Sequence, residues 1–191
     1  SGRTLTPGGS FLPYLPSAAV GGADGFVTKF DADGNVLWEL IVGSSVFDTV
    51  GRIAADSSGN VVFTGAFTFF GTQDTATDPS PIFVTTAGVY PEGRLMRNGD
   101  IFVVKLNGSG STLFASLLGG SNLETTYAAA VDDVGNIYIV GATDSFDYPR
   151  NEGAYDETPA GSITATKIKF DGSQLLYSTG LRTTGNTYAT S

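Results

Sequence analysis

The chain of 191 residues contains no cysteine and no histidine. Without cysteine it has no disulfide framework and no thiolate nucleophile. Without histidine it lacks the usual general base near neutral pH and the commonest side-chain ligand of transition metals. Ser-His-Asp catalysis, Cys-His catalysis and histidine-based zinc sites are therefore excluded within this chain, and carboxylate chemistry is the main remaining route to an active site.

Positive charge is also scarce, because 10 lysine and arginine residues stand against 19 aspartate and glutamate residues, for a net charge of −9. Binding to nucleic acid or to anionic lipid depends on clustered basic side chains, and the sequence has no such cluster. We therefore expect no nucleic-acid partner. No stretch approaches the roughly 18 to 20 apolar residues that span a bilayer, so no transmembrane segment is expected either.

Glycine is abundant, with 26 residues, while methionine occurs once. Together with many serine and threonine residues, this composition favours strands and turns over helices and is common in secreted bacterial proteins. Residues 1–23 lack the charged start and continuous apolar block of a secretory signal, and their proline and apolar residues are typical of an extended arm.

An internal repeat is the strongest signal in the sequence. When the chain is shifted by 76 positions, residues 24–68 align with residues 100–144 without a gap, and 15 of 45 positions are identical. Each copy contains four short apolar segments. The intervening turns carry glycine at a fixed place after aspartate or asparagine, as in Asp56–Asn60 and Asp132–Asn136, which is typical of hairpins. The repeat unit is therefore predicted to be a four-stranded antiparallel meander.

The motifs that open, continue and close this unit are residues 100–106, 117–121 and 131–143. They resemble the SBBP-type bacterial β-propeller repeat, and the resemblance covers roughly residues 24–68 and 100–191. It implies an all-β fold of propeller blades in surface-exposed or secreted bacterial proteins, with no common catalytic residue. Since propellers usually need roughly four to eight blades, the chain is predicted to be an incomplete propeller of two full blades plus part of a third.

The predicted organisation follows from the repeat. It comprises an extended N-terminal arm (1–23), a first blade (24–68), an enlarged linker loop (69–99), a second blade (100–144), a linker (145–162) and a partial third blade (163–191). The partial blade is expected to leave a strand edge unpaired, and such an edge is a template for another strand. We expect the arm to dock on a neighbouring blade, within the chain or from another copy.

Two turns each carry a pair of aspartates that could hold a cation. Asp31 and Asp33 suggest a calcium loop, but Gly34 falls at its fourth position, whereas an EF-hand requires glycine at the sixth. A hairpin turn is the favoured interpretation, and a loosely held calcium ion is the alternative. Asp132 and Asp133 receive the same interpretation.

Paired carboxylates can hydrolyse a glycoside when they lie about 5 to 10 Å apart. The acids without a turn assignment are Glu39, Asp48, Glu92, Glu124, Glu152, Asp156 and Glu157. None lies in a recognisable motif, so no catalytic, cofactor-binding or metal-binding residue is assigned. Among the aromatic residues, Trp38 aligns with Phe114 and is predicted to pack in the core. Phe69 and Phe70 have no counterpart in the repeat and are predicted to pack on their own blade rather than to form a contact surface.

These observations favour a non-catalytic extracellular or cell-surface structural protein that self-assembles through exchange of strands or edges into a ring or a filament. Its expected partners are copies of itself, with a surface glycan or another protein as further candidates. An adhesive, carbohydrate-binding or protein-binding propeller module is the alternative, and a carboxylate-dependent hydrolase is a remote one.

Overall fold

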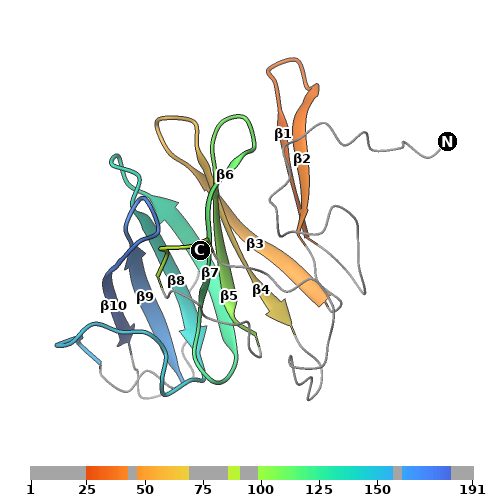
Figure 1. Ribbon diagram of the computed structural model, residues 1–191. Coiled ribbons are helices and arrows are strands. Elements are labelled where there is room, and N and C mark those ends of the chain that lie inside the picture. The colour runs from red at the N-terminus through yellow and green to blue at the C-terminus, as the bar shows by residue number, and fades with distance from the viewer. Residues whose placement is uncertain (1–24, 43–46, 69–85, 91–98, 157–160, 182–191) are drawn as a thin grey trace.

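The computed structural model of the chain describes residues 25–42, 47–68, 86–90, 99–156 and 161–181 (Figure 1). In these ranges the chain forms ten strands and no helix, so the prediction of an all-β fold is confirmed. The strands are β1 (Gly25–Phe30), β2 (Val36–Val42), β3 (Phe47–Ala55), β4 (Val61–Thr68), β5 (Ile101–Leu106), β6 (Thr112–Leu118), β7 (Glu124–Val131), β8 (Ile137–Thr143), β9 (Ser162–Ile168) and β10 (Leu175–Leu181). Within the described ranges there is accordingly no helix of the length and apolar character that would cross a membrane.

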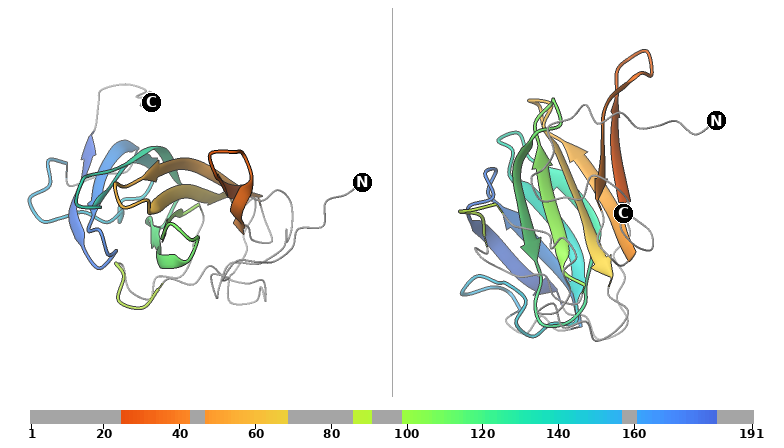
Figure 2. Two further views of the ribbon diagram at one scale, coloured as in Figure 1. Left: turned by 90° about the horizontal axis from the view of Figure 1, so that it is seen from above. Right: turned by 45° about the vertical axis from the view of Figure 1, so that its right-hand side comes forward.

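The strands form three antiparallel sheets. Sheet A is the hairpin of β1 and β2, sheet B runs β3-β4-β5-β6, and sheet C runs β7-β8-β9-β10. Every strand in a sheet pairs with its neighbour in the sequence, so sheets B and C are four-stranded meanders of the kind that the repeat predicts. Figure 2 shows the three sheets as successive layers.

The sheets begin two strands later than the units drawn from the repeat. Residues 24–68 hold the strands of sheet A and half of sheet B, and β9 and β10 complete sheet C instead of opening a separate partial blade. A periodic sequence fixes the length of the unit but not its phase, because any four consecutive strands repeat equally well. The phase is set by pairing of β4 with β5, which joins Val61 to Leu106 across the long connection.

The connections follow from this arrangement. Residues 69–99 and 145–162, predicted as linkers between blades, join neighbouring strands within one sheet, and the short connections 43–46 and 119–123 lead from one sheet to the next. The predicted arm (1–23) and the Phe69–Phe70 pair lie outside the described residues.

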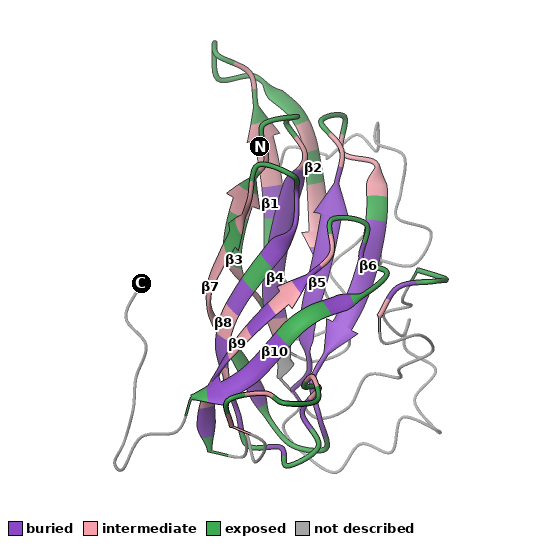
Figure 3. Ribbon diagram, turned by 90° about the vertical axis from the view of Figure 1, so that its left-hand side faces the viewer, coloured by how far each residue is buried: buried purple, intermediate pink, exposed green. Residues whose placement is uncertain are grey.

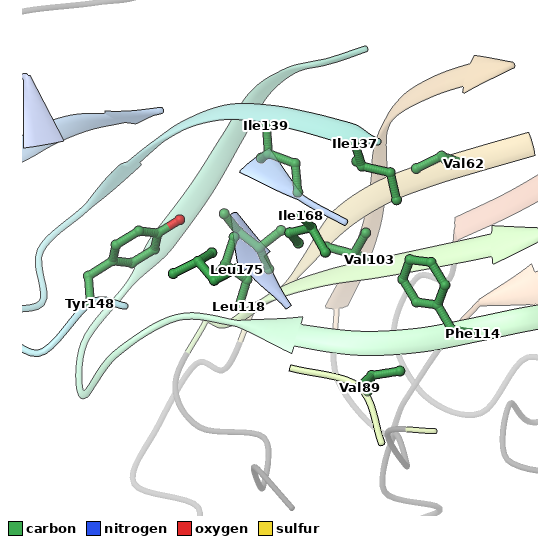
Figure 4. Packing of buried hydrophobic residues seen from close by; sticks show 11 residues of the cluster. Val62, Val89, Val103, Phe114, Leu118, Ile137, Ile139, Tyr148, Ile168 and Leu175 are labelled. Atoms are coloured by element: carbon green, nitrogen blue, oxygen red, sulfur yellow. The ribbon is translucent and has the colours of Figure 1, made fainter. Parts of the chain in front are cut away.

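The layers are held together by two apolar cores. One core lies between sheets A and B and includes Val27 and Val42 of sheet A with Phe63 and Phe102 of sheet B. The other lies between sheets B and C, where Val103 and Phe114 meet Ile137, Ile139 and Ile168 (Figure 4). Sheet B is therefore covered on both faces, by sheet A and by sheet C, which explains why all six residues of β5 are buried.

Sheets B and C come closest where β7, the first strand of sheet C, lies beside β3 and β4 of sheet B. Two contacts mark this approach: the Thr64 and Thr126 hydroxyl groups lie 3.3 Å apart, and the Arg52 side chain donates a hydrogen bond to the Tyr127 carbonyl. Successive four-stranded meanders whose first strands lie side by side are consistent with propeller blades.

Candidate interaction surface

The turn acids of the sequence cap their own hairpins. The Asp31 carboxylate accepts hydrogen bonds from the backbone N–H groups of Asp33 and Asn35, at 3.0 and 2.8 Å, and from the Asn35 side chain. The hydrogen bonds from Asn35 are the main cause of the lowered pKa of Asp31. This geometry favours the hairpin interpretation over the calcium loop, because both oxygens of the carboxylate already accept hydrogen bonds. Asp33 is exposed.

Asp56 and Asp132 cap the turns between β3 and β4 and between β7 and β8 in the same way, through Asn60 and Asn136. Asp133, beside Asp132, is exposed. No group of three or more acids that could hold a metal ion occurs among the described residues. The repeated Asp-x-x-Gly-Asn pattern is thus explained by turn formation.

The candidate carboxylates are spread over the molecule. Glu39 is exposed on β2 and accepts a hydrogen bond from Thr28, Glu152 is exposed, and Asp156 is partly buried. Asp48 lies in β3, where its side chain is outside the description, as are Glu92 and Glu157.

Glu124 is the one member of that set which the structure places beside another buried acid in the described part of the chain. Its carboxylate accepts hydrogen bonds of 2.6 Å from the Thr143 and Ser145 hydroxyl groups, and burial raises its pKa. Asp100, which the sequence analysis did not single out, lies close by: a Cβ atom on Gly119 would meet Asp100 Oδ1 at 2.1 Å and Glu124 Oε2 at 2.5 Å. Both acids are almost fully buried, so this corner is a closed packing site that requires glycine rather than an open catalytic cleft.

A lysine on the third strand of the blade forms the clearest polar link between sheets. Lys105 Nζ, on β5 of sheet B, donates hydrogen bonds to the carbonyls of Gly135 (3.1 Å) and Phe170 (3.2 Å) in two turns of sheet C. It also lies 3.5 Å from Asp56 Oδ2, and both side chains are buried. Because a buried ammonium group must be paired and hydrogen-bonded, this arrangement ties the two sheets together in one geometry.

The same link recurs between sheets A and B. Lys29 Nζ, on β1, donates a 2.9 Å hydrogen bond to the carbonyl of Gly108 in the turn between β5 and β6. In each case the accepting carbonyl lies two residues before the turn glycine, Gly110 or Gly172. We refer to this contact as the lysine clamp.

An aromatic ring accompanies each clamp. Trp38 is the cross-strand partner of Lys29, and Phe114 is the cross-strand partner of Lys105. A Cβ atom on Gly110 would lie 2.9 Å from the Trp38 ring, and one on Gly172 would lie 2.8 Å from the Phe114 ring. The ring of one sheet thus fits against the turn glycine of the next. Trp38, predicted to pack in the core, is partly buried and packs against the core between sheets A and B, whereas Phe114 is fully buried.

Sheet C carries the same pattern on the side that faces away from sheet B. There Lys167 of β9 pairs with Tyr138 of β8 and Tyr177 of β10, as Lys105 pairs with Val62 and Phe114 in sheet B. Cross-strand partners point to the same face of a sheet. The row Tyr138-Lys167-Tyr177 is therefore the counterpart of a row that sheet C covers on sheet B.

The row on sheet B and its counterpart on sheet C differ in solvent exposure. Phe114 is 1% exposed and Tyr177 is 43% exposed, while Val62 is 0% and Tyr138 is 37% exposed. Two further rows of sheet C match covered rows of sheet B: Val140-Ala165-Thr179, in which Thr179 is buried, and Ala142-Ile163-Leu181. These three rows are called the outward face of sheet C, and Figure 3 shows intermediate and exposed segments on β8, β9 and β10 from this side.

The charged groups of this face interact with one another and with an aromatic ring. Lys167 Nζ lies 3.4 Å from Asp132 Oδ2 and 4.6 Å from the centre of the Tyr138 ring. Partial burial opposes ionisation of Asp132, but hydrogen bonds from Asn136, Lys167 and Tyr138 lower its pKa to about 2. The pair repeats the Lys105–Asp56 pair of sheet B without the two turn carbonyls that Lys105 also reaches. Sequence reasoning missed this role, although a lysine that recurs within an apolar strand was its signal.

Comparison with known proteins gives limited support for the propeller-type fold. The chain is 25% identical over 138 residues to an uncharacterized WD repeat-containing protein of Acanthamoeba polyphaga mimivirus. The matched region covers 71% of this chain but only 9% of that protein. No family model matches the chain, so the resemblance to the SBBP-type repeat stays a prediction.

Proposed function

We propose that this chain is a non-catalytic structural and protein-binding module of β-propeller type, located outside the cell or on its surface. Its binding site is the outward face of sheet C. The observation that carries the proposal is the row-by-row match between this face and the face of sheet B that sheet C covers. Because the two faces have matching residue rows, the face on sheet C is suited to being covered by a partner, as the face on sheet B is covered by sheet C.

The chemistry of the face favours a protein partner. The face offers apolar side chains, two tyrosines and one lysine, and its covered counterpart receives a sheet with turn carbonyls. Tyrosine-rich apolar patches with few charges are typical of the centres of protein interfaces. The similarity to a WD repeat-containing protein is in keeping with an interaction module, and the closed acid corner at Glu124 offers no accessible pair of carboxylates for hydrolysis.

The absence of cysteine allows a sharp test, because one introduced cysteine is the only thiol of the chain. Tyr177→Cys places it on the outward face, and Phe146→Cys places it at an exposed position in the connection after β8 as a matched control. Each variant is treated, on intact cells that produce it and in their medium, with a membrane-impermeant maleimide that carries a photo-cross-linker.

The proposal expects discrete protein adducts from position 177 and none from position 146. Identical adduct patterns from both positions, or no adduct from either, contradict a binding face on sheet C. Thiol labelling that occurs only after cell lysis contradicts the extracellular location. Adducts made of glycan alone support the adhesive carbohydrate-binding alternative instead.

A further inference from the structure

We propose that the outward face of sheet C binds the outer side of sheet A in a second copy of this chain, so that copies join head to tail. This inference rests on the proposed function and names the partner for its binding face. The outer side of sheet A is the side turned away from sheet B, which carries Phe26 and Phe30. It is argued from four contacts that occur within the chain and whose counterparts on these two surfaces have no partner among the described residues.

The first argument is the apolar character of sheet A on its outer side. Phe26 is 69% exposed, whereas its equivalent in sheet B, Phe102, is 0% exposed under sheet A. Phe30 is 56% exposed, and its equivalent Leu106 is fully buried in the same core. The side of sheet B that receives sheet A therefore has the same kind of apolar surface as the outer side of sheet A.

The second argument is the vacant position at Gly34, in the turn between β1 and β2. Gly34, Gly110 and Gly172 all adopt positive φ angles, of 83°, 86° and 77°. Gly110 and Gly172 each lie against an aromatic ring of the preceding sheet, but a Cβ atom on Gly34 would meet no atom within 4 Å. Tyr177, the exposed counterpart of those rings, has the matching position on the outward face of sheet C.

The third argument concerns the hydrogen bonds that lysine side chains donate to backbone carbonyls. The lysine clamps end on carbonyls two residues before the turn glycine, and the corresponding carbonyl in sheet A belongs to Ala32, which is exposed. In a second copy this carbonyl would accept a hydrogen bond from Lys167.

The fourth argument is a backbone hydrogen bond that lies beside the lysine clamp. Tyr90 N–H donates a 2.8 Å hydrogen bond to the Gly172 carbonyl, linking the connection that runs beside β6 to sheet C. The segment that holds Tyr155 repeats this connection beside β10, and Tyr155 is 85% exposed. In the proposed contact the Tyr155 N–H would donate to the Gly34 carbonyl of the second copy.

Two different surfaces meet in this contact, so the association is heterologous and continues into a ring or a filament. Sheet A contributes two described strands, fewer than the four of sheet C, and the contact is accordingly weaker than the one between sheets B and C. Association should therefore depend on concentration and be complete only well above the micromolar range.

The test compares the size of the intact chain and three aspartate variants by sedimentation velocity, from low micromolar to near-millimolar concentration. Tyr177→Asp damages the outward face of sheet C, and Phe26→Asp damages the outer side of sheet A. Phe146→Asp adds the same charge at an exposed position in the connection after β8, outside the strands that form both surfaces. All three positions are exposed, and circular dichroism with thermal unfolding in dilute solution verifies that each variant folds.

We expect the intact chain and Phe146→Asp to grow in size with concentration, and each of the other two variants to remain monomeric. An equimolar mixture of Tyr177→Asp and Phe26→Asp should form dimers and stop there, because one intact surface remains on each copy. An intact chain that stays monomeric at the highest concentration overturns the inference, and so does association that Phe26→Asp leaves unchanged. Neither result affects the cross-linking test of the binding face, so the two proposals fail separately.

Discussion

Truncating two equivalent aromatic rings should have very different effects on stability. Phe114 and Tyr177 occupy the same place in sheets B and C, beside Lys105 and Lys167 respectively. Phe114 is 1% exposed, and its ring lies against Gly172. Replacing a buried phenylalanine by alanine costs about 3 to 5 kcal/mol, since both the apolar transfer energy and the packing around the cavity are lost.

The matched change Tyr177→Ala removes a ring that is 43% exposed and lacks a covering sheet in the described chain. Its cost should be about 1 kcal/mol or less, as for surface substitutions. With an m-value of about 2 kcal/mol/M in urea, the two costs correspond to midpoint shifts of about 2 M for Phe114→Ala and about 0.5 M for Tyr177→Ala.

Urea unfolding followed by circular dichroism measures both shifts. It is done at a concentration low enough for the copies to be dissociated, because association would add stability to the intact chain by mass action. Equal shifts for the two variants would refute the reasoning, since they would mean that both rings are covered or that neither is. A larger shift for Tyr177→Ala would show that the sheets are stacked in another order.

Three further predictions follow from the same geometry. Lys105→Met should lower the free energy of unfolding by about 3 to 5 kcal/mol, because it breaks a buried ion pair. Lys167→Met should lower it by less than about 1 kcal/mol in the monomer, because its ion pair is partly exposed. Similar losses for the two variants in urea unfolding would contradict the clamp. Burial raises the pKa of Glu124 above its ordinary value of 4.5, so stability should fall as the pH rises from that value through the folded-state pKa, and a Glu124→Gln variant with an unchanged pH profile would argue against this. Gly172→Ala should destabilise the protein more than Gly34→Ala, because both strain a positive φ but only Gly172 faces a ring; equal melting temperatures would count against that packing.

Much of the fold could be predicted from the sequence because its signals are local. The glycine that follows aspartate or asparagine at a fixed spacing defines the hairpin turns, and the apolar segments between them define the strands. The phase of the sheets could not be obtained in this way. It depends on pairing of β4 with β5 and of β8 with β9 across long connections, and no local pattern reports which distant strand is the partner.

The candidate site was less predictable for a related reason. Lys29 and Lys105 were visible as identical positions of the repeat, but their role depends on carbonyls contributed by the next sheet. Backbone carbonyls have no sequence signature. The acid corner shows the same limit, because Asp100 and Glu124 stand 24 positions apart and meet only where Gly119 leaves room for both.

The outward face of sheet C differs from its covered counterpart in one informative respect. Val62 and Phe114 of sheet B are replaced by Tyr138 and Tyr177, so two wholly apolar side chains become rings that carry a hydroxyl group. The Tyr138 hydroxyl donates a hydrogen bond to Asp132. Tyrosine can face water with its hydroxyl group and still bury its ring against a partner, which valine and phenylalanine cannot do equally well. A face that is covered permanently gains nothing from this exchange, whereas a face that is alternately free and bound gains solubility without losing contact area. The substitution therefore fits a surface that binds reversibly better than one left over from the interior of a closed ring.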